Sequence, residues 1–226
     1  MHVNIVIFPN VVPLDFIGPY EVLSRVPGWT VDLVAADMNP VATDRGLAFL
    51  PTCTRATAKP SDLLVIPGGA GADDAMLDPA WVEFTAAQAE TAQYVFGICT
   101  GAFLLGAAGL LRGKRAGAHW QARDLLARFG AIPIDDRIVI DGKYYTSGGV
   151  SSGIDAALKV VADIEGEERA QVIQLAIEYD PHPPLKGGTP FTSPKAIVDT
   201  VIEAGKERRA IREGKVDIAA SRLQAP

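Results

Sequence analysis

The residues with the clearest chemical potential surround Cys99. A short apolar run, Tyr94–Ile98, ends at this cysteine, and a helical pattern follows at once. Gly97 and Gly101 lie two residues before and two residues after it. Gly-x-Cys-x-Gly between a strand and a helix is the thiol form of the nucleophile elbow, a sharp turn that strains its central residue. The glycines are needed because a Cβ at either position would collide with the neighbouring strand or helix.

The position of Cys99 decides between a chemical and a structural role. Free cysteines are among the most buried residues, and a lone cysteine is usually structural. That interpretation suits Cys53, which has no glycine two residues before it or two residues after it. At Cys99 the flanking Gly97 and Gly101 favour a catalytic role, and unpaired N–H groups at a helix N-terminus favour the thiolate. We therefore expect Cys99 to be an exposed, ionisable sulfur nucleophile.

Asp15 is the second candidate catalytic residue, because it follows the first predicted strand, His2–Phe8. Its carboxyl group can cap the helix that begins there. Alternatively, it can face the thiol across a crevice, where burial beside a thiolate would raise its pKa and make it a proton donor and acceptor. The local sequence leaves both interpretations open.

Backbone donors are the third expected component of the site. In Pro67-Gly68-Gly69, glycine lets N–H groups approach a substrate closely, so the Gly69 and Thr100 N–H groups could stabilise an anion near the sulfur. As a bare turn signal this motif is weak. The Thr100 hydroxyl can cap the helix, or it can orient a substrate or water.

His119, Gly148 and Gly149 are possible accessory residues. His119 follows a short predicted strand and could point into the same crevice, although a histidine satisfied within the core is the more common outcome. Gly148 and Gly149 belong to a glycine-rich loop that lacks the Walker pattern and its lysine, so close packing beside Cys99 explains them better. We expect no catalytic role for His2 or His182.

The elements that position these residues alternate between strands and helices. Predicted strands cover 2–8, 30–36, 63–66, 94–98 and the hairpin 137–146 around Asp141-Gly142, and predicted helices cover 15–23, 79–93, 99–113, 121–129, 151–164, 165–178 and 195–212. The proline-rich segment 180–194 is expected to be a loop. This alternation predicts a mostly parallel sheet with helices on both faces, and a ligand crevice at the carboxyl ends of the strands.

Composition limits the classes of function. The formal net charge of −6 argues against a nucleic-acid partner, and the basic piece 206–209 is interleaved with acids like a solvated helix face. No apolar run approaches the roughly 20 residues that span a bilayer, and we expect no signal peptide. Two cysteines suit a reducing, cytoplasmic compartment. Cysteine and histidine are too scattered for a zinc site, so no metal is expected.

Taken together, these residues resemble the DJ-1/PfpI (ThiJ) superfamily over nearly the whole chain. The motifs that carry the resemblance are Leu14-Asp15-Phe16-Ile17-Gly18-Pro19, Pro67-Gly68-Gly69, Gly97-Ile98-Cys99-Thr100-Gly101-Ala102, Ala118-His119-Trp120 and Thr146-Ser147-Gly148-Gly149. The closer resemblance is to the isonitrile (isocyanide) hydratases, through Asp at the acidic position and the pattern of residues 174–184.

The resemblance implies a flavodoxin-like three-layer α/β sandwich of the class I glutamine amidotransferase type. It implies one domain over residues 1–226, with a helical extension from about 165 to 226, and a homodimer. It places the nucleophile at Cys99 and its acidic partner at Asp15. Thr100 stands where protease and glyoxalase members have histidine, which counts against a protease.

The implied activity is hydration of an organic isonitrile to the N-substituted formamide, without metal or organic cofactor. Two alternatives remain. One is a redox-responsive protein in which Cys99 is oxidised to a sulfinate. The other is a ligand-binding domain related to transcription regulators, although the chain ends at Pro226 without room for a helix-turn-helix domain.

Overall fold

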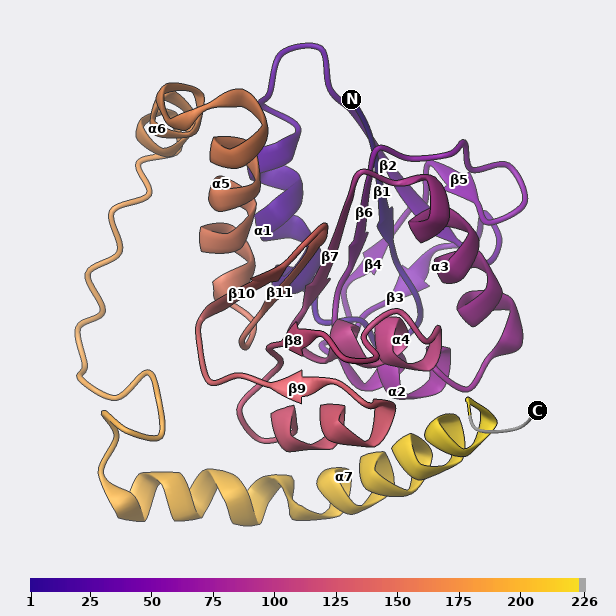
Figure 1. Ribbon diagram of the computed structural model, residues 1–226. Coiled ribbons are helices and arrows are strands. Elements are labelled where there is room, and N and C mark those ends of the chain that lie inside the picture. The colour runs from indigo at the N-terminus through magenta and orange to yellow at the C-terminus, as the bar shows by residue number, and fades with distance from the viewer. Residues whose placement is uncertain (224–226) are drawn as a thin grey trace.

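A seven-stranded sheet forms the centre of the fold, in the order β10-β11-β7-β6-β1-β2-β5 (Figure 1). The computed structural model describes residues 1–223, and its sheet strands are β1 (His2–Val6), β2 (Thr30–Ala35), β5 (Cys53–Thr54), β6 (Leu63–Ile66), β7 (Tyr94–Ile98), β10 (Ile138–Asp141) and β11 (Tyr144–Ser147). Only β10 and β11 pair antiparallel within this sheet. The prediction of a mostly parallel sheet with a hairpin at Asp141-Gly142 is confirmed.

Helices cover both faces of the sheet and complete the three-layer sandwich (Figure 1). One face carries α1 (Pro13–Leu23) and α5 (Ser152–Glu165), with α6 (Glu167–Ala176) packed on α5. The other carries α3 (Pro79–Thr91) and α4 (Ala102–Ala107), with α2 (Ala70–Ala75) against α4. The arrangement confirms the predicted flavodoxin-like fold.

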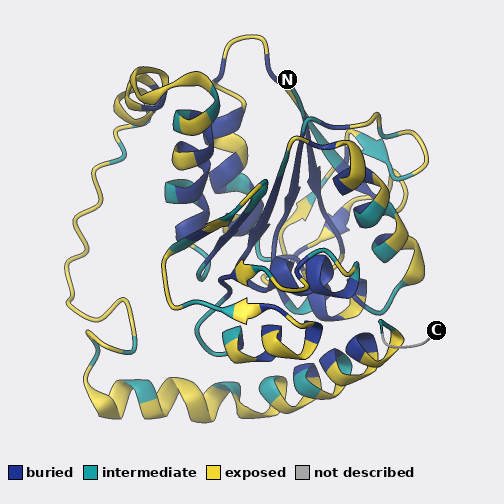
Figure 2. Cartoon of the chain, in the orientation of Figure 1, coloured by how far each residue is buried: buried dark blue, intermediate teal, exposed yellow. Residues whose placement is uncertain are grey.

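The central strands are apolar on both sides because both faces are covered. All four residues of β6 are fully buried, as are Val3, Ile5 and Phe96 of the adjacent strands (Figure 2). A continuous apolar run of this kind is typical of a parallel strand between two helical layers. The rigid core fixes where each strand ends, and therefore where Asp15, Gly69 and Cys99 lie.

The short elements differ from the sequence prediction. The helix after Cys99 starts as a 3-10 turn, η1 (Cys99–Gly101), and α4 ends at Ala107 rather than near residue 113. Gly109 and Gly113 adopt positive φ, which interrupts the helix. Residues 121–129 form the 3-10 helix η2 (Arg123–Phe129). The two-residue strands β3 (Val41–Ala42), β4 (Ala48–Phe49), β8 (Arg115–Ala116) and β9 (Ile132–Pro133) are too short to leave a periodic signal.

The largest difference is the last helix, α7 (Lys195–Arg222). It continues ten residues past the predicted end at Arg212 and follows the edge of the sheet where the parallel strands finish (Figure 1). Its C-terminal half buries Val216, Ala219 and Ala220, whereas its N-terminal half is mostly exposed (Figure 2). Residues 224–226, which the predicted extension and single domain included, lie outside the described residues.

Ion pairs attach α7 to the body of the protein. Arg212 Nε lies 2.7 Å from Asp73 Oδ1 of α2, and both side chains are almost fully buried. Arg128 of η2 pairs with Asp217 at 2.5 Å. The partners are far apart in sequence, so no local pattern reveals them. Within residues 1–223 no helix combines the length and apolar character needed to cross a bilayer.

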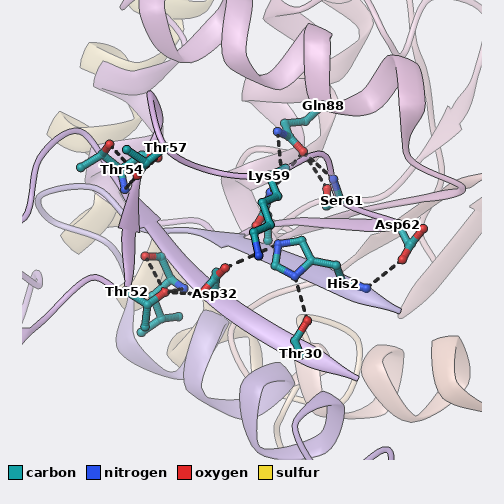
Figure 3. A network of polar contacts seen from close by, with 12 residues as sticks. His2, Thr30, Asp32, Thr52, Thr54, Thr57, Lys59, Ser61, Asp62 and Gln88 are labelled. Atoms are coloured by element: carbon teal, nitrogen blue, oxygen red, sulfur yellow. Dashed lines mark hydrogen bonds and ion pairs between the residues drawn. The ribbon is translucent and has the colours of Figure 1, made fainter. Parts of the chain in front are cut away.

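A polar network fixes the amino ends of the strands, away from Cys99 (Figure 3). The His2 main-chain N–H donates to Asp62 Oδ2 at 2.8 Å, and His2 Nδ1 lies 2.9 Å from Thr30 Oγ1. Gln88 Oε1 accepts hydrogen bonds from the N–H and the hydroxyl of Ser61. His2 therefore ties β1 to its neighbours.

Substitution of Gly101 tests the packing of the turn at Cys99. A Cβ there would lie 2.1 Å from the Ile66 carbonyl oxygen of β6, a backbone atom that cannot move alone. We expect Gly101→Ala to lower the free energy of unfolding by about 3 kcal/mol or more in urea titrations. The control is Gly214→Ala in α7, which faces open space and should gain about 0.5–1 kcal/mol. A Gly101→Ala protein as stable as the wild type would contradict this packing.

Candidate active site

Cys99 occupies a strained turn between β7 and α4. Its φ of 56° is in the left-handed region, which L-residues with side chains seldom adopt. Its N–H donates to the Gly148 carbonyl at 3.1 Å, and a Cβ at Gly97 would lie 2.8 Å from Leu105 Cδ1. The strained backbone and the need for both flanking glycines agree with the sequence prediction.

Asp15 lies in the first turn of α1 and is fully buried. The N-cap position is Val12, and no side chain caps this helix. Asp15 Oδ2 instead accepts a hydrogen bond from the Gly68 N–H at 2.9 Å. Of the two interpretations left open for this carboxyl, the structure matches the one in which it faces the thiol.

The Asp15 carboxyl and the Cys99 thiol interact directly. Burial raises the pKa of Asp15 to about 7, although the Gly68 N–H and the Cys99 thiol both favour its ionised form. Asp15 Oδ1 is buried without a hydrogen-bond partner, and the Cys99 thiol is close enough to the carboxyl group to lower its pKa. One proton can therefore be exchanged between carboxyl and sulfur.

The expectation of an exposed sulfur is wrong. Cys99 is 5% exposed. Burial raises the pKa of its thiol, and the charge of Asp15 raises it further. The N–H groups of Val150 and Thr100 favour the thiolate, but their effect is smaller than that of burial. Burial and the charge of Asp15 therefore both favour the neutral thiol over the thiolate.

Thr100 and the two glycines after β6, Gly68 and Gly69, pack beside this pair. The Gly69 N–H donates to Thr100 Oγ1 at 3.0 Å, so it does not point at the sulfur as predicted. A Cβ at Gly68 would lie within 3.0 Å of both Thr100 and Asp15, so only glycine lets the groups converge. The backbone donors near the sulfur are Thr100 and Val150. Sequence reasoning expected the loop near Val150 to suit an apolar substrate, but it missed the Val150 N–H as a donor.

The three possible accessory residues, His119, Gly148 and Gly149, all lie close to Cys99 or to one another. His119 Nδ1 accepts from the Gln121 N–H at 3.3 Å, which assigns the ring proton to Nε2. Burial lowers the pKa of His119 to about 4, so the ring is neutral at pH 7. A Cβ at Gly149 would lie 2.6 Å from the His119 ring, and Gly148 holds the Cys99 N–H. Both glycines thus serve close packing beside Cys99.

A cavity of about 590 Å³ opens above Cys99, and Thr100, His119, Val150 and Gly69 also line it. Its far wall is α7, which contributes Arg208, Arg209 and Arg212. Sequence reasoning missed this wall and took residues 206–209 for a solvated helix face. Within the described part of the chain, no cluster of three or more His, Cys, Asp or Glu residues could hold a metal ion.

Comparison with known proteins identifies the family. A profile of the DJ-1/PfpI family matches residues 1–163. The chain belongs to the DJ-1/PfpI family. Family relatives include the isonitrile hydratase of Pseudomonas putida, which is 42% identical over 223 residues, or 99% of this chain and 98% of that protein. The resemblance predicted from the sequence motifs is confirmed.

Two further family relatives differ in how much of their length they share. A solved ThiJ/PfpI family protein from Pseudomonas syringae has a TM-score of 0.92 and 36% identity, over 97% of this chain and 90% of that one. The HTH-type transcriptional regulator CdhR of Pseudomonas aeruginosa is 28% identical over 76% of this chain but only 53% of its own length. The Pseudomonas syringae structure therefore shares the extension after residue 163, including most of α7.

The buried carboxyl makes a prediction about stability. The pKa of Asp15 rises from 3.8 to about 7 on folding, so the folded state binds its proton more tightly than the unfolded state. This contribution to stability is full below about pH 4 and is lost as the pH rises to about 7. Between pH 5 and pH 8, the wild type should lose about 2–3 kcal/mol relative to Asp15→Asn in urea titrations. The exposed-site control Asp37→Asn should follow the wild type, and parallel curves for all three proteins would contradict the prediction.

Proposed function

We propose that this protein hydrates organic isonitriles, R–N≡C, to N-substituted formamides through a thioimidate on Cys99. The observation that carries the proposal is the buried Asp15 carboxyl against the Cys99 thiol at the base of a cavity. The reaction is that of the Pseudomonas putida relative, which shares 42% of its residues over almost the full length of both chains.

The first step adds the thiol across the terminal carbon of the isonitrile. Asp15, as a carboxylate, takes the S–H proton while sulfur bonds to that carbon. The proton then passes from Asp15 to the carbon lone pair, giving R–N=CH–S–Cys99. A neutral thiol beside a carboxylate therefore supplies both the nucleophile and the proton, and no resting thiolate is required.

The second step releases the product. Asp15, again a carboxylate, takes a proton from water as the water oxygen bonds to the thioimidate carbon, and it passes that proton to the nitrogen, giving R–NH–CH(OH)–S–Cys99. The C–S bond then breaks as Asp15 moves the hydroxyl proton to the departing sulfur, and R–NH–CHO leaves. The N–H groups of Thr100 and Val150 favour negative charge on the sulfur as it departs. Each proton transfer in the two steps passes through the Asp15 carboxyl group.

The cavity suits a small, partly apolar substrate. Val12, Leu14 and Val150 line it together with Cys99, and apolar walls favour an alkyl or aryl group on the isonitrile nitrogen. We propose that Thr100 is a positioning residue that does not itself contact the substrate. Its hydroxyl bonds to both the N–H and the carbonyl of Gly69, which holds the β6 loop against the turn at Cys99.

We further propose a cytoplasmic homodimer whose subunits each form one domain. Ile197, Val201 and Ile202 of α7, together with Phe191 of the preceding loop, are exposed apolar side chains. Such patches on a folded surface are typical of protein–protein contacts.

The redox-responsive alternative gains no support from the surroundings of the sulfur. Oxidation to a sulfinate proceeds through an accessible thiolate, and burial raises the pKa of the Cys99 thiol. A ligand-binding role without turnover is distinguished from catalysis by the activity measurement below.

The central test is formamide formation from cyclohexyl isonitrile, followed by chromatography. Cys99→Ala should abolish turnover, because the nucleophile is gone. Asp15→Asn should lower kcat/KM by about 10²–10⁴-fold, because the proton relay is lost. Rapid quenching and intact-mass analysis of the wild type should show an adduct equal to one substrate, located on Cys99. Cys53→Ala is the control and should retain full activity, whereas turnover by Cys99→Ala would overturn the mechanism.

The pH dependence of the reaction tests the role of Asp15. The active pair holds one proton, shared between Asp15 and Cys99, and below pH about 7 a second proton fills the carboxylate. We expect kcat/KM to fall about tenfold per pH unit well below pH 7 and to level off above it. In Asp15→Asn this limb should vanish. A wild-type profile that is flat from pH 5.5 to 8.5 would contradict the assignment.

A further inference from the structure

The wall that α7 presents to the Cys99 cavity is strongly cationic. Arg208, Arg209 and Arg212 all line it. Arg208 and Arg212 are four residues apart, so they lie on the same face of the helix. Three guanidinium groups above a buried nucleophile are not needed for the hydration chemistry, which uses one carboxyl and one thiol.

Two of these arginines have structural partners. Arg209 forms a bidentate ion pair with Asp124, both contacts at 2.7 Å, and also donates to the Gln121 carbonyl. Arg212 Nε donates to Asp73 Oδ1 at 2.7 Å. The Arg212 side chain is 6% exposed, and its Nη2 is buried without a hydrogen-bond partner. A donor on this wall is thus left unsatisfied.

Arg208 is the third member, and its charge is uncompensated. Among residues 1–223, no carboxylate oxygen lies within 4.0 Å of its guanidinium, whereas Arg209 and Arg212 each have one. Its positive charge reaches the site, since it favours the ionised form of Asp15. Asp44 also lines the cavity and affects the pKa of Asp15 more than Arg208 does, but Arg45, a further lining residue, lies 3.6 Å from the Asp44 carboxylate. The wall therefore carries an excess of positive charge.

We propose that this wall is a subsite for a carboxylate on the substrate, with Arg208 as its main ligand and Arg212 Nη2 as a second donor. A carboxylate carries negative charge and has two oxygens that accept hydrogen bonds from guanidinium groups, so it can use a donor from each of the two arginines. The preferred substrate is then an isonitrile whose other end is an acid. The identity of that reactive end rests on the proposed function, whereas the anion subsite does not.

Alkylation of Cys99 tests the subsite without any isonitrile. Iodoacetate and iodoacetamide differ in one negative charge, and peptide mass analysis separates Cys99 from Cys53. The measured quantity is the ratio of the two alkylation rates at Cys99. Any change in the thiol pKa affects both reagents equally and cancels in this ratio.

We expect Arg208→Gln to lower the iodoacetate-to-iodoacetamide ratio about three- to tenfold at low ionic strength, and salt to shrink the wild-type preference. Arg208→Lys should retain part of the preference. The matched control is Lys206→Gln, on an exposed position of the same helix that does not line this cavity; it should leave the ratio unchanged. A ratio that is the same in the wild type and Arg208→Gln overturns the subsite.

Turnover separates the subsite from the proposed function. We expect kcat/KM for 4-isocyanobutanoate to exceed that for its methyl ester, and Arg208→Gln to reduce this preference by the same three- to tenfold. If neither compound nor cyclohexyl isonitrile is hydrated while the alkylation ratio behaves as expected, hydration fails and the anion subsite stands. Equal turnover of acid and ester in both proteins overturns the carboxylate preference and leaves hydration intact.

Discussion

The structure depends on the contact between a buried carboxyl and a buried thiol. Asp15 lies in the first turn of α1 and Cys99 follows β7, and the absence of a Cβ at Gly68 lets Asp15 and Thr100 pack closely beside it. Burial disfavours charge on either group and raises the pKa of both. The two groups therefore hold their protons to a higher pH than they would in water, and they titrate as a coupled pair. The strained backbone at Cys99, the Thr100 hydroxyl and the Gly68 N–H all hold this arrangement. The core supplies the rigidity that keeps these groups in contact.

A second constraint comes from the C-terminal helix. The family profile covers residues 1–163, yet the cavity above Cys99 is closed by α7, beyond that limit. The buried Asp73–Arg212 pair fixes the helix over the site. Truncating one member of such a pair leaves an uncompensated charge in the interior. The same helix that shapes the cavity therefore also determines its electrostatic character, and with it the kind of substrate that the proposed reaction would take.

Much of the fold follows from local patterns. The four-residue run Leu63–Ile66 and the turn at Asp141-Gly142 are explicit signals for a buried strand and a hairpin, and both are present. The two-residue strands and the end of α4 are not encoded in this way, because glycine φ angles and contacts with distant residues decide them. The site divides similarly. The Cys99 turn is visible in its glycine frame, whereas Val150 and the α7 arginines reach the cavity only through packing.

By itself the sequence determined the candidate reactive groups, which are a cysteine between two glycines and an acid after the first strand. It also determined a parallel α/β fold that brings the strand ends together. These are local properties, since they depend on residue type, spacing and hydrophobic pattern. Only the tertiary structure decided the burial of the sulfur, the actual partner of the Gly69 N–H and the identity of the cavity wall. The burial of a group and the electrostatic potential around it depend on residues that are far apart in the chain. A short segment of sequence therefore does not reveal them.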